Sequence, residues 1–189
     1  MELTRSLVET KAAQYRDSQP LSTVETEHIE ILPGMLTEGD FGWRDVEWVV
    51  QWYFRRYLGA YPNRKRRAVE DAFGENTYEE VMQTLSSVSE MTDPRAKLEA
   101  LQTLDGVDVR VGSAFLFFMF PETYVPVGDR EWEALSVAGH LSEPYPDSLS
   151  VEEYLTYYDA CVELMDAFEV DPWTLYRALW QLGSERAEN

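Results

Sequence analysis

The chain has 189 residues, of which 44% are hydrophobic and 13% aromatic, so it can bury one sizeable core and is not a disordered chain. Its 35 acidic residues outnumber its 16 basic ones, and the formal net charge of −19 is far beyond what solubility requires. Cys161 is the only cysteine, which excludes an internal disulfide and any cysteine-based zinc or iron–sulfur site within one chain. His28 and His140 lack ligand-type spacing, so we expect no metal and no cofactor.

The positive charge comes almost entirely from arginine, because only Lys11, Lys65 and Lys97 are lysines. Few lysines and many carboxylates are typical of proteins from extreme halophiles, where molar salt shortens the Debye length to roughly 3 Å and screens repulsion between carboxylates. The alternative is an acidic mesophilic protein, whose carboxylates repel nucleic acid or bind basic partners.

The first helices are predicted in the N-terminal part of the chain. A weak apolar stripe runs from Leu3 to Tyr15, and a short helix near His28 is expected to end at the Pro33-Gly34 pair. Residues 1–40 are therefore expected to form an N-terminal helical extension that packs on a helical domain spanning residues 41–189.

Helical signals continue through the rest of the chain. Apolar residues recur at helical spacing from Trp43 to Tyr57. Capping signals open further helices at Thr77 to Glu80, Asp93-Pro94, Asp129, Ser150 to Glu153 and Asp171-Pro172. Val109 to Phe120 is apolar almost all round, which suits a central buried helix. No segment alternates with period two, so we predict an all-α, single-domain helical bundle.

No membrane association is expected. The segment from Met1 to Lys11 mixes charges and lacks an apolar signal core. The longest apolar run, Ala114 to Phe120, is far shorter than the roughly 20 residues that a membrane span needs. We therefore expect a cytoplasmic protein.

The segment from Leu98 to Leu135 contains a recognisable pattern. It reads as a helix, the turn Leu104-Asp105-Gly106-Val107-Asp108, a buried helix with Arg110 and Gly112-Ser113-Ala114, and then Val127-Gly128-Asp129 at a helix start. This pattern resembles the helix-hairpin-helix region of the HhH-GPD superfamily of DNA glycosylases, in which a hairpin of the type Leu-Pro-Gly-Val-Gly precedes a buried helix and a catalytic aspartate follows. The order of the flanking helices extends the resemblance to residues 41–183, although the motif itself spans only Leu104 to Asp129.

The resemblance implies roles for the hairpin residues. Gly106 and Val107 would present backbone amides to a DNA phosphate, a contact that positions DNA without reading its sequence. Asp108 stands where the family has a second glycine, and it adds both a carboxylate and a Cβ at a place of close approach. This departure weighs against ordinary duplex binding through the hairpin.

The resemblance also concerns catalysis. Arg110 falls where bifunctional members place the lysine that attacks the sugar, and a guanidinium that stays protonated is not expected to form a Schiff base. Asp129 matches the catalytic aspartate, so a monofunctional glycosylase is conceivable with this carboxylate and a pocket for a flipped base. Alternatively, Asp129 only caps its helix.

A basic cluster stands out in this acidic chain. Residues 41–70 contain seven basic and three acidic residues, a local charge of +4, which leaves −23 for the remainder. The cluster comprises Arg55, Arg56, Arg64, Lys65, Arg66 and Arg67. It could bind a DNA backbone or, alternatively, be tethered to the protein's own carboxylates.

Three functional hypotheses follow from the sequence. The favoured one is an HhH-GPD-like scaffold that has lost catalysis and serves as an interaction module for a protein partner. The second is a monofunctional DNA glycosylase or lesion-binding protein that lacks lyase activity. The third is a helical protein that binds a small molecule. The sequence does not indicate an oligomeric state.

Overall fold

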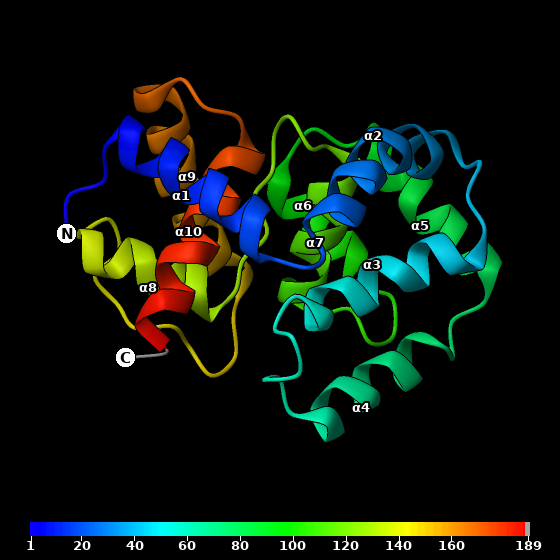
Figure 1. Ribbon diagram of the computed structural model, residues 1–189. Helices are drawn as coiled ribbons and strands as arrows, with labels where there is room; N and C mark the ends of the chain where they lie inside the picture. The colour runs from blue at the N-terminus through cyan, green and yellow to red at the C-terminus, as the bar shows by residue number, and fades with distance from the viewer. Residues whose placement is uncertain (188–189) are drawn as a thin grey trace. The chain divides into compact units, whose positions relative to one another are not determined.

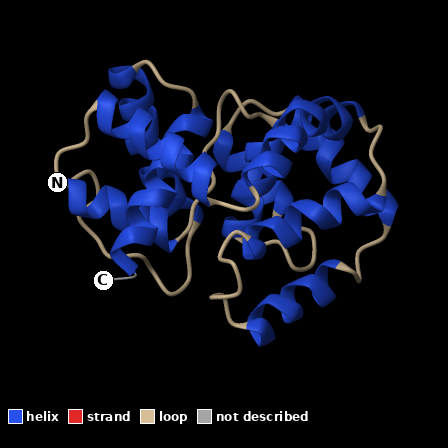
Figure 2. Ribbon diagram, viewed as in Figure 1, coloured by secondary structure: helices blue, strands red, loops and turns tan. Residues whose placement is uncertain are grey.

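The structure is a computed structural model that describes residues 1–187, and this part of the chain contains helices and loops but no strand (Figure 2). The predicted all-α class is therefore confirmed. The ten helices of this part are α1 (Arg5–Ser18), α2 (Ser22–Glu38), α3 (Trp43–Arg55), α4 (Asn63–Phe73), α5 (Tyr78–Glu90), α6 (Pro94–Leu101), α7 (Val109–Met119), α8 (Asp129–Ala138), α9 (Val151–Phe168) and α10 (Pro172–Ala187) (Figure 1). None of the helices described is long and apolar enough to cross a membrane.

The chain divides into two compact units. The terminal unit combines Met1–Thr26 with Pro121–Asn189, and the middle unit is Glu27–Phe120. One change of unit falls inside α2 and the other directly after α7. The boundary at residue 40 that the sequence suggested differs from this division, and the separate N-terminal extension stays a prediction.

The middle unit is built around α3 and α7, which pack against each other. Val46 and Val49 of α3 are completely buried, and the ring of Trp52 stacks 5.8 Å from that of Phe117 in α7. Every residue of α7 except Arg110 is buried, as its all-round apolar sequence predicts. The turn between α6 and α7 confirms the helix-hairpin-helix segment.

The terminal unit is organised by α10, which packs on α1, α8 and α9 (Figure 1). Gly183 of α10 touches the backbone of α8 so closely that a Cβ there would lie 2.1 Å from the carbonyl oxygen of Arg130. On the α1 side, the buried Tyr15 hydroxyl donates to Glu25 at 2.7 Å and lies 3.1 Å from the hydroxyl of Tyr176. The contact at Gly183 fixes α8, whose first residue is Asp129, against α10, and the tyrosine pair joins α1 to α10.

The two predicted capping boxes are confirmed, whereas one predicted helix end is wrong. Thr77 with Glu80, and Ser150 with Glu153, form complete capping boxes at the starts of α5 and α9. However, α2 continues through Pro33 to Glu38 instead of ending at Pro33-Gly34. Leu32 and Leu36 are both buried, and their packing holds the helix together across a residue that would otherwise break it.

Candidate functional site

The segment that leads to Asp129 is held by two tyrosines of α9. The hydroxyl of Tyr154 donates to the carbonyl of Val125 at 3.2 Å, and that of Tyr157 donates to the carbonyl of Pro126 at 2.9 Å. Burial raises the pKa of both tyrosines well above the ordinary value, so both hydroxyls stay protonated and able to donate. The start of α8 is therefore fixed from within the terminal unit.

Asp129 is not the N-cap of α8, so the predicted capping position is wrong by one residue. Gly128, with extended backbone (φ −155°, ψ 176°), occupies the N-cap, and Asp129 is the first helical residue. Its Oδ1 accepts a hydrogen bond from the backbone N–H of Arg130 at 2.9 Å, and the residue is exposed. The carboxylate of Asp129 therefore lies at the N-terminal end of α8 and is open to solvent.

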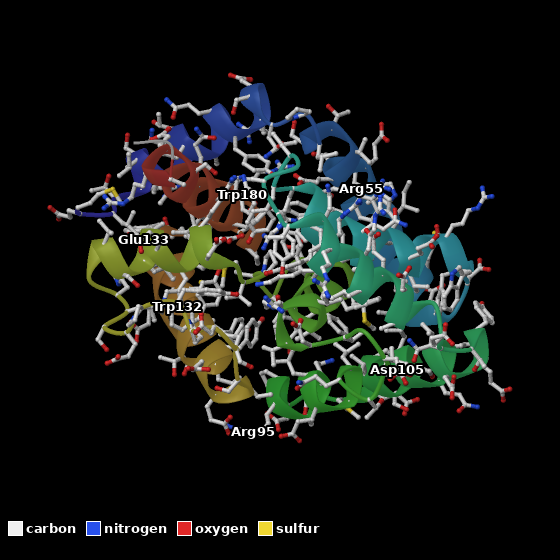
Figure 3. All side chains as sticks on the ribbon, turned by 90° about the horizontal axis from the view of Figure 1, so that it is seen from below. Arg55, Arg95, Asp105, Trp132, Glu133 and Trp180 are labelled. Atoms are coloured by element: carbon white, nitrogen blue, oxygen red, sulfur yellow. The ribbon has the colours of Figure 1, made fainter. Side chains whose placement is uncertain are left out.

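Asp129 lies at a charged hollow of about 630 Å³ between α8 and α10. This α8–α10 hollow is lined by Asp129, Arg130, Glu133, Tyr145, Gly183, Arg186 and Ala187. Nε of Arg186 lies 3.7 Å from Oε1 of Glu133. The guanidinium of Arg130 sits 4.4 Å from the ring centre of Trp180 and donates to Ser184 at 2.8 Å. Figure 3 labels Glu133 on α8 and Trp180 on α10. Acidic and basic groups thus meet at one concave surface, which contains the candidate catalytic carboxylate.

In the middle unit, the predicted hairpin residues already make contacts within the protein. Gly106 has φ +76°, and a Cβ there would lie 2.6 Å from both the carbonyl oxygen of Val69 and the nitrogen of Phe73 in α4. The N–H of Asp105 donates to Asn76 at 2.9 Å, and that of Val107 donates to the carbonyl of Leu104 at 3.2 Å. The glycine thus allows close packing on α4, and two neighbouring amides are already engaged.

Asp108 and Arg110 form a pair at the start of α7. Asp108 caps the helix by accepting from the N–H of Val111 at 3.0 Å, and its other oxygen accepts from Nε of Arg110 at 2.7 Å. Burial opposes the charge of Arg110, but the charge and hydrogen bonds of Asp108 outweigh burial and raise the pKa of the guanidinium. Arg110 also reaches the hydroxyl of Tyr61 at 3.4 Å, so this side chain is held in place by its neighbours.

The basic cluster divides into exposed and buried members. Arg55, Arg64, Lys65 and Arg67 are exposed, whereas Arg66 is half-buried and pairs with Glu70 at 3.4 Å. Arg56 is completely buried, donates to the carbonyl of Tyr53 at 3.1 Å and lies 4.5 Å from the ring centre of that tyrosine. Arg56 therefore adds nothing to an exposed basic surface, which corrects its place among the candidates for DNA contact.

The candidate residues are distributed over both units. Asp129 belongs to the terminal unit, and the hairpin, Arg110 and the basic cluster belong to the middle unit. Sequence reasoning missed the partners of Asp129 in the α8–α10 hollow. Gly183 inside a helical pattern was the signal for it, since such a glycine often marks close backbone approach. Within the described residues, no group of three His, Cys, Asp or Glu side chains is placed to hold a metal ion.

The hairpin between α6 and α7 is followed by an aspartate at the start of α8, within an all-helical fold. The structure is similar to that of the Methanocaldococcus jannaschii 8-oxoguanine glycosylase/lyase in complex with a 15mer DNA containing 8-oxoguanine. The TM-score is 0.52 at 13% sequence identity, and the similarity covers 94% of this chain and 97% of that one. No family model and no curated protein matches the sequence. The similarity shows the fold alone.

Proposed function

We propose that this protein binds DNA and hydrolyses the N-glycosidic bond of an altered base, without lyase activity. The observation that carries the proposal is the exposed Asp129 at the start of α8, beside a hollow of about 630 Å³, in a chain with the fold of a DNA glycosylase. The hollow is large enough for a base turned out of the duplex, which an enzyme acting on a base requires.

The proposed reaction needs a carboxylate and water. The bond between the sugar C1′ and the base nitrogen breaks, the base leaves with the bonding electrons, and positive charge develops on the sugar. Asp129 stabilises this charge electrostatically, a water oxygen adds to C1′, and the proton of that water is transferred to the departing base. The tyrosines that bond the carbonyls of Val125 and Pro126 hold the backbone that leads to Asp129, so the start of α8 need not reorganise during the reaction.

Lyase chemistry would need a neutral amine that attacks C1′. Arg110 stands at the corresponding position, and Asp108 holds its guanidinium charged. A permanently charged guanidinium has no lone pair to offer as a nucleophile. We therefore expect no covalent intermediate that borohydride can trap.

The test is a base-release assay on duplexes that carry oxidised, deaminated or alkylated bases, each run over a series of KCl concentrations. The proposal predicts release by the wild-type protein, an at least hundredfold loss in Asp129→Asn, and unchanged release by the matched control Asp159→Asn. Asp159 is also an exposed aspartate of the terminal unit, but it lies on α9 away from the hollow. Equal activity of wild type and Asp129→Asn would refute the role of this carboxylate.

A second candidate function is a scaffold that has lost catalysis and binds a protein partner. The Asp108–Arg110 pair favours it, because Asp108 stands where the resemblance implies a second glycine and puts a carboxylate beside the expected phosphate contact. This candidate predicts no base release from any duplex and no DNA binding at any salt concentration, together with a stable complex with a partner protein.

We also propose that the protein works in the cytoplasm of a halophile. The net charge of −19 with only three lysines supports this reading, since molar salt removes most of the repulsion between surface carboxylates. Activity and stability should therefore be measured at molar as well as at low KCl concentration.

A further inference from the structure

Helix α4 presents a basic face in an acidic chain. Arg64, Lys65 and Arg67 are exposed on the first turns of this helix, and no ion pair involves any of them within the part of the chain that the structure describes. The alternative that these cations are tethered to the protein's own carboxylates is therefore unsupported. Exposed, unpaired cations on one helix face form an electrostatic surface suited to phosphate.

The helix face is also concave. A hollow of about 540 Å³ runs along it, lined by Asn63, Arg64, Arg67, Ala68 and Asp71. Two arginines on consecutive turns of a helix can follow successive phosphates, and the amide of Asn63 adds a neutral donor. Asp71 is the one carboxylate in this wall, against the two guanidinium groups. Figure 1 shows α4 at the edge of the middle unit, with this helix outside the core formed by α3 and α7.

The surroundings of the hairpin are acidic, in contrast to the basic face of α4. A smaller hollow beside it, of about 250 Å³, includes Glu75, Glu80 and Asp105 in its wall. Asp108 follows on the other side of Gly106, and its carboxylate is engaged by Arg110 and by the N–H of Val111. The three carboxylates of Glu75, Glu80 and Asp105 near the turn repel a phosphate. The packing of Gly106 on α4 covers the glycine that would allow close approach.

We infer that the DNA backbone is bound by the basic face of α4, in place of the hairpin between α6 and α7. This inference rests on the proposed function in that it assumes DNA binding, and it names the surface that performs it. At molar salt the Debye length is roughly 3 Å, so a DNA phosphate is influenced chiefly by the charges that it touches. The local cations of α4 therefore outweigh the net charge of −19.

The experiment measures binding of a short fluorescent duplex that carries an abasic-site analogue, over a KCl series, for four proteins. Arg64→Gln/Arg67→Gln removes two charges from α4. Arg16→Gln/Arg44→Gln removes two exposed charges elsewhere and is the matched control. Asp105→Asn removes one negative charge at the hairpin.

The inference predicts weaker binding by Arg64→Gln/Arg67→Gln at every salt concentration, with the slope of log K against log[KCl] reduced by about 1 for each arginine. The control pair and Asp105→Asn should bind within twofold of wild type. If Asp105→Asn binds more tightly while the α4 variant binds like wild type, the hairpin is the contact, and the inference fails although DNA binding stands. If the wild type binds no duplex at any salt concentration, the proposed function fails together with this inference.

Discussion

Gly183 affects both the stability of the terminal unit and the position of the candidate site, because it lies against the backbone of Arg130, the residue after Asp129. In Gly183→Ala, the new Cβ would lie 2.1 Å from the carbonyl oxygen and 2.7 Å from the Cα of Arg130. Because these are backbone atoms that no rotamer change can move, α8 and α10 must separate by roughly 1 Å. Overpacking of this kind typically costs about 1–3 kcal/mol, which exceeds the gain of up to about 1 kcal/mol from replacing glycine by alanine within a helix. We therefore expect a net loss of up to about 2 kcal/mol in the free energy of unfolding.

The assay is urea-induced unfolding followed by circular dichroism, with Gly34→Ala as the matched control. Gly34 also lies inside a helix, α2, but a Cβ there would meet no atom within 4 Å. Gly34→Ala should therefore gain about 0.5–1 kcal/mol, opposite in sign to Gly183→Ala. Since Asp129 precedes Arg130 directly, base release should fall in Gly183→Ala and not in Gly34→Ala. Equal stability of the two variants would refute the close packing of α8 on α10.

Further predictions concern the α7 cap, the buried thiol and salt. Asp108→Ala should lower the free energy of unfolding by about 1–2 kcal/mol in urea titrations, and Asp108→Asn by less, because asparagine keeps the cap to Val111 and loses only the charge that faces Arg110. Burial raises the pKa of the Cys161 thiol, so a thiolate-specific reagent at pH 8 should label the protein only after unfolding; rapid labelling of the native protein would contradict this packing. The melting temperature should rise between low and molar KCl, and a flat profile would contradict the halophilic interpretation.

Local signals in the sequence were sufficient for much of the fold. The capping boxes at Thr77 and Ser150 were predictable because a hydroxyl and a glutamate three residues later satisfy each other without help from the rest of the chain. The buried α7 was predictable from its all-round apolar residues. The course of α2 through Pro33 was not, because the burial of Leu32 and Leu36 depends on contacts made elsewhere in the fold.

The site was less predictable than the fold for a similar reason. Asp129 and Arg110 were found through a motif, but the ion pair that immobilises Arg110 depends on side-chain directions that spacing does not specify. Arg56 shows the same limit, since sequence proximity grouped it with exposed arginines although its guanidinium lies among the rings of Trp52, Tyr53 and Tyr57. Charge clusters in sequence thus predict a surface only after burial is known.

A single side chain, Asp108, links the two proposals. As the N-cap of α7 it cannot be removed without cost to the fold, and as the partner of Arg110 it offsets a charge that would otherwise be partly buried alone. Its carboxylate also repels phosphate at the turn, so any contact with DNA must use another cationic surface, and the middle unit offers the exposed cations of α4. The absence of a nucleophilic amine follows from the arginine at position 110, whose guanidinium stays protonated in any case. Asp108 holds that guanidinium in place, and the same carboxylate makes the hairpin unsuitable for phosphate.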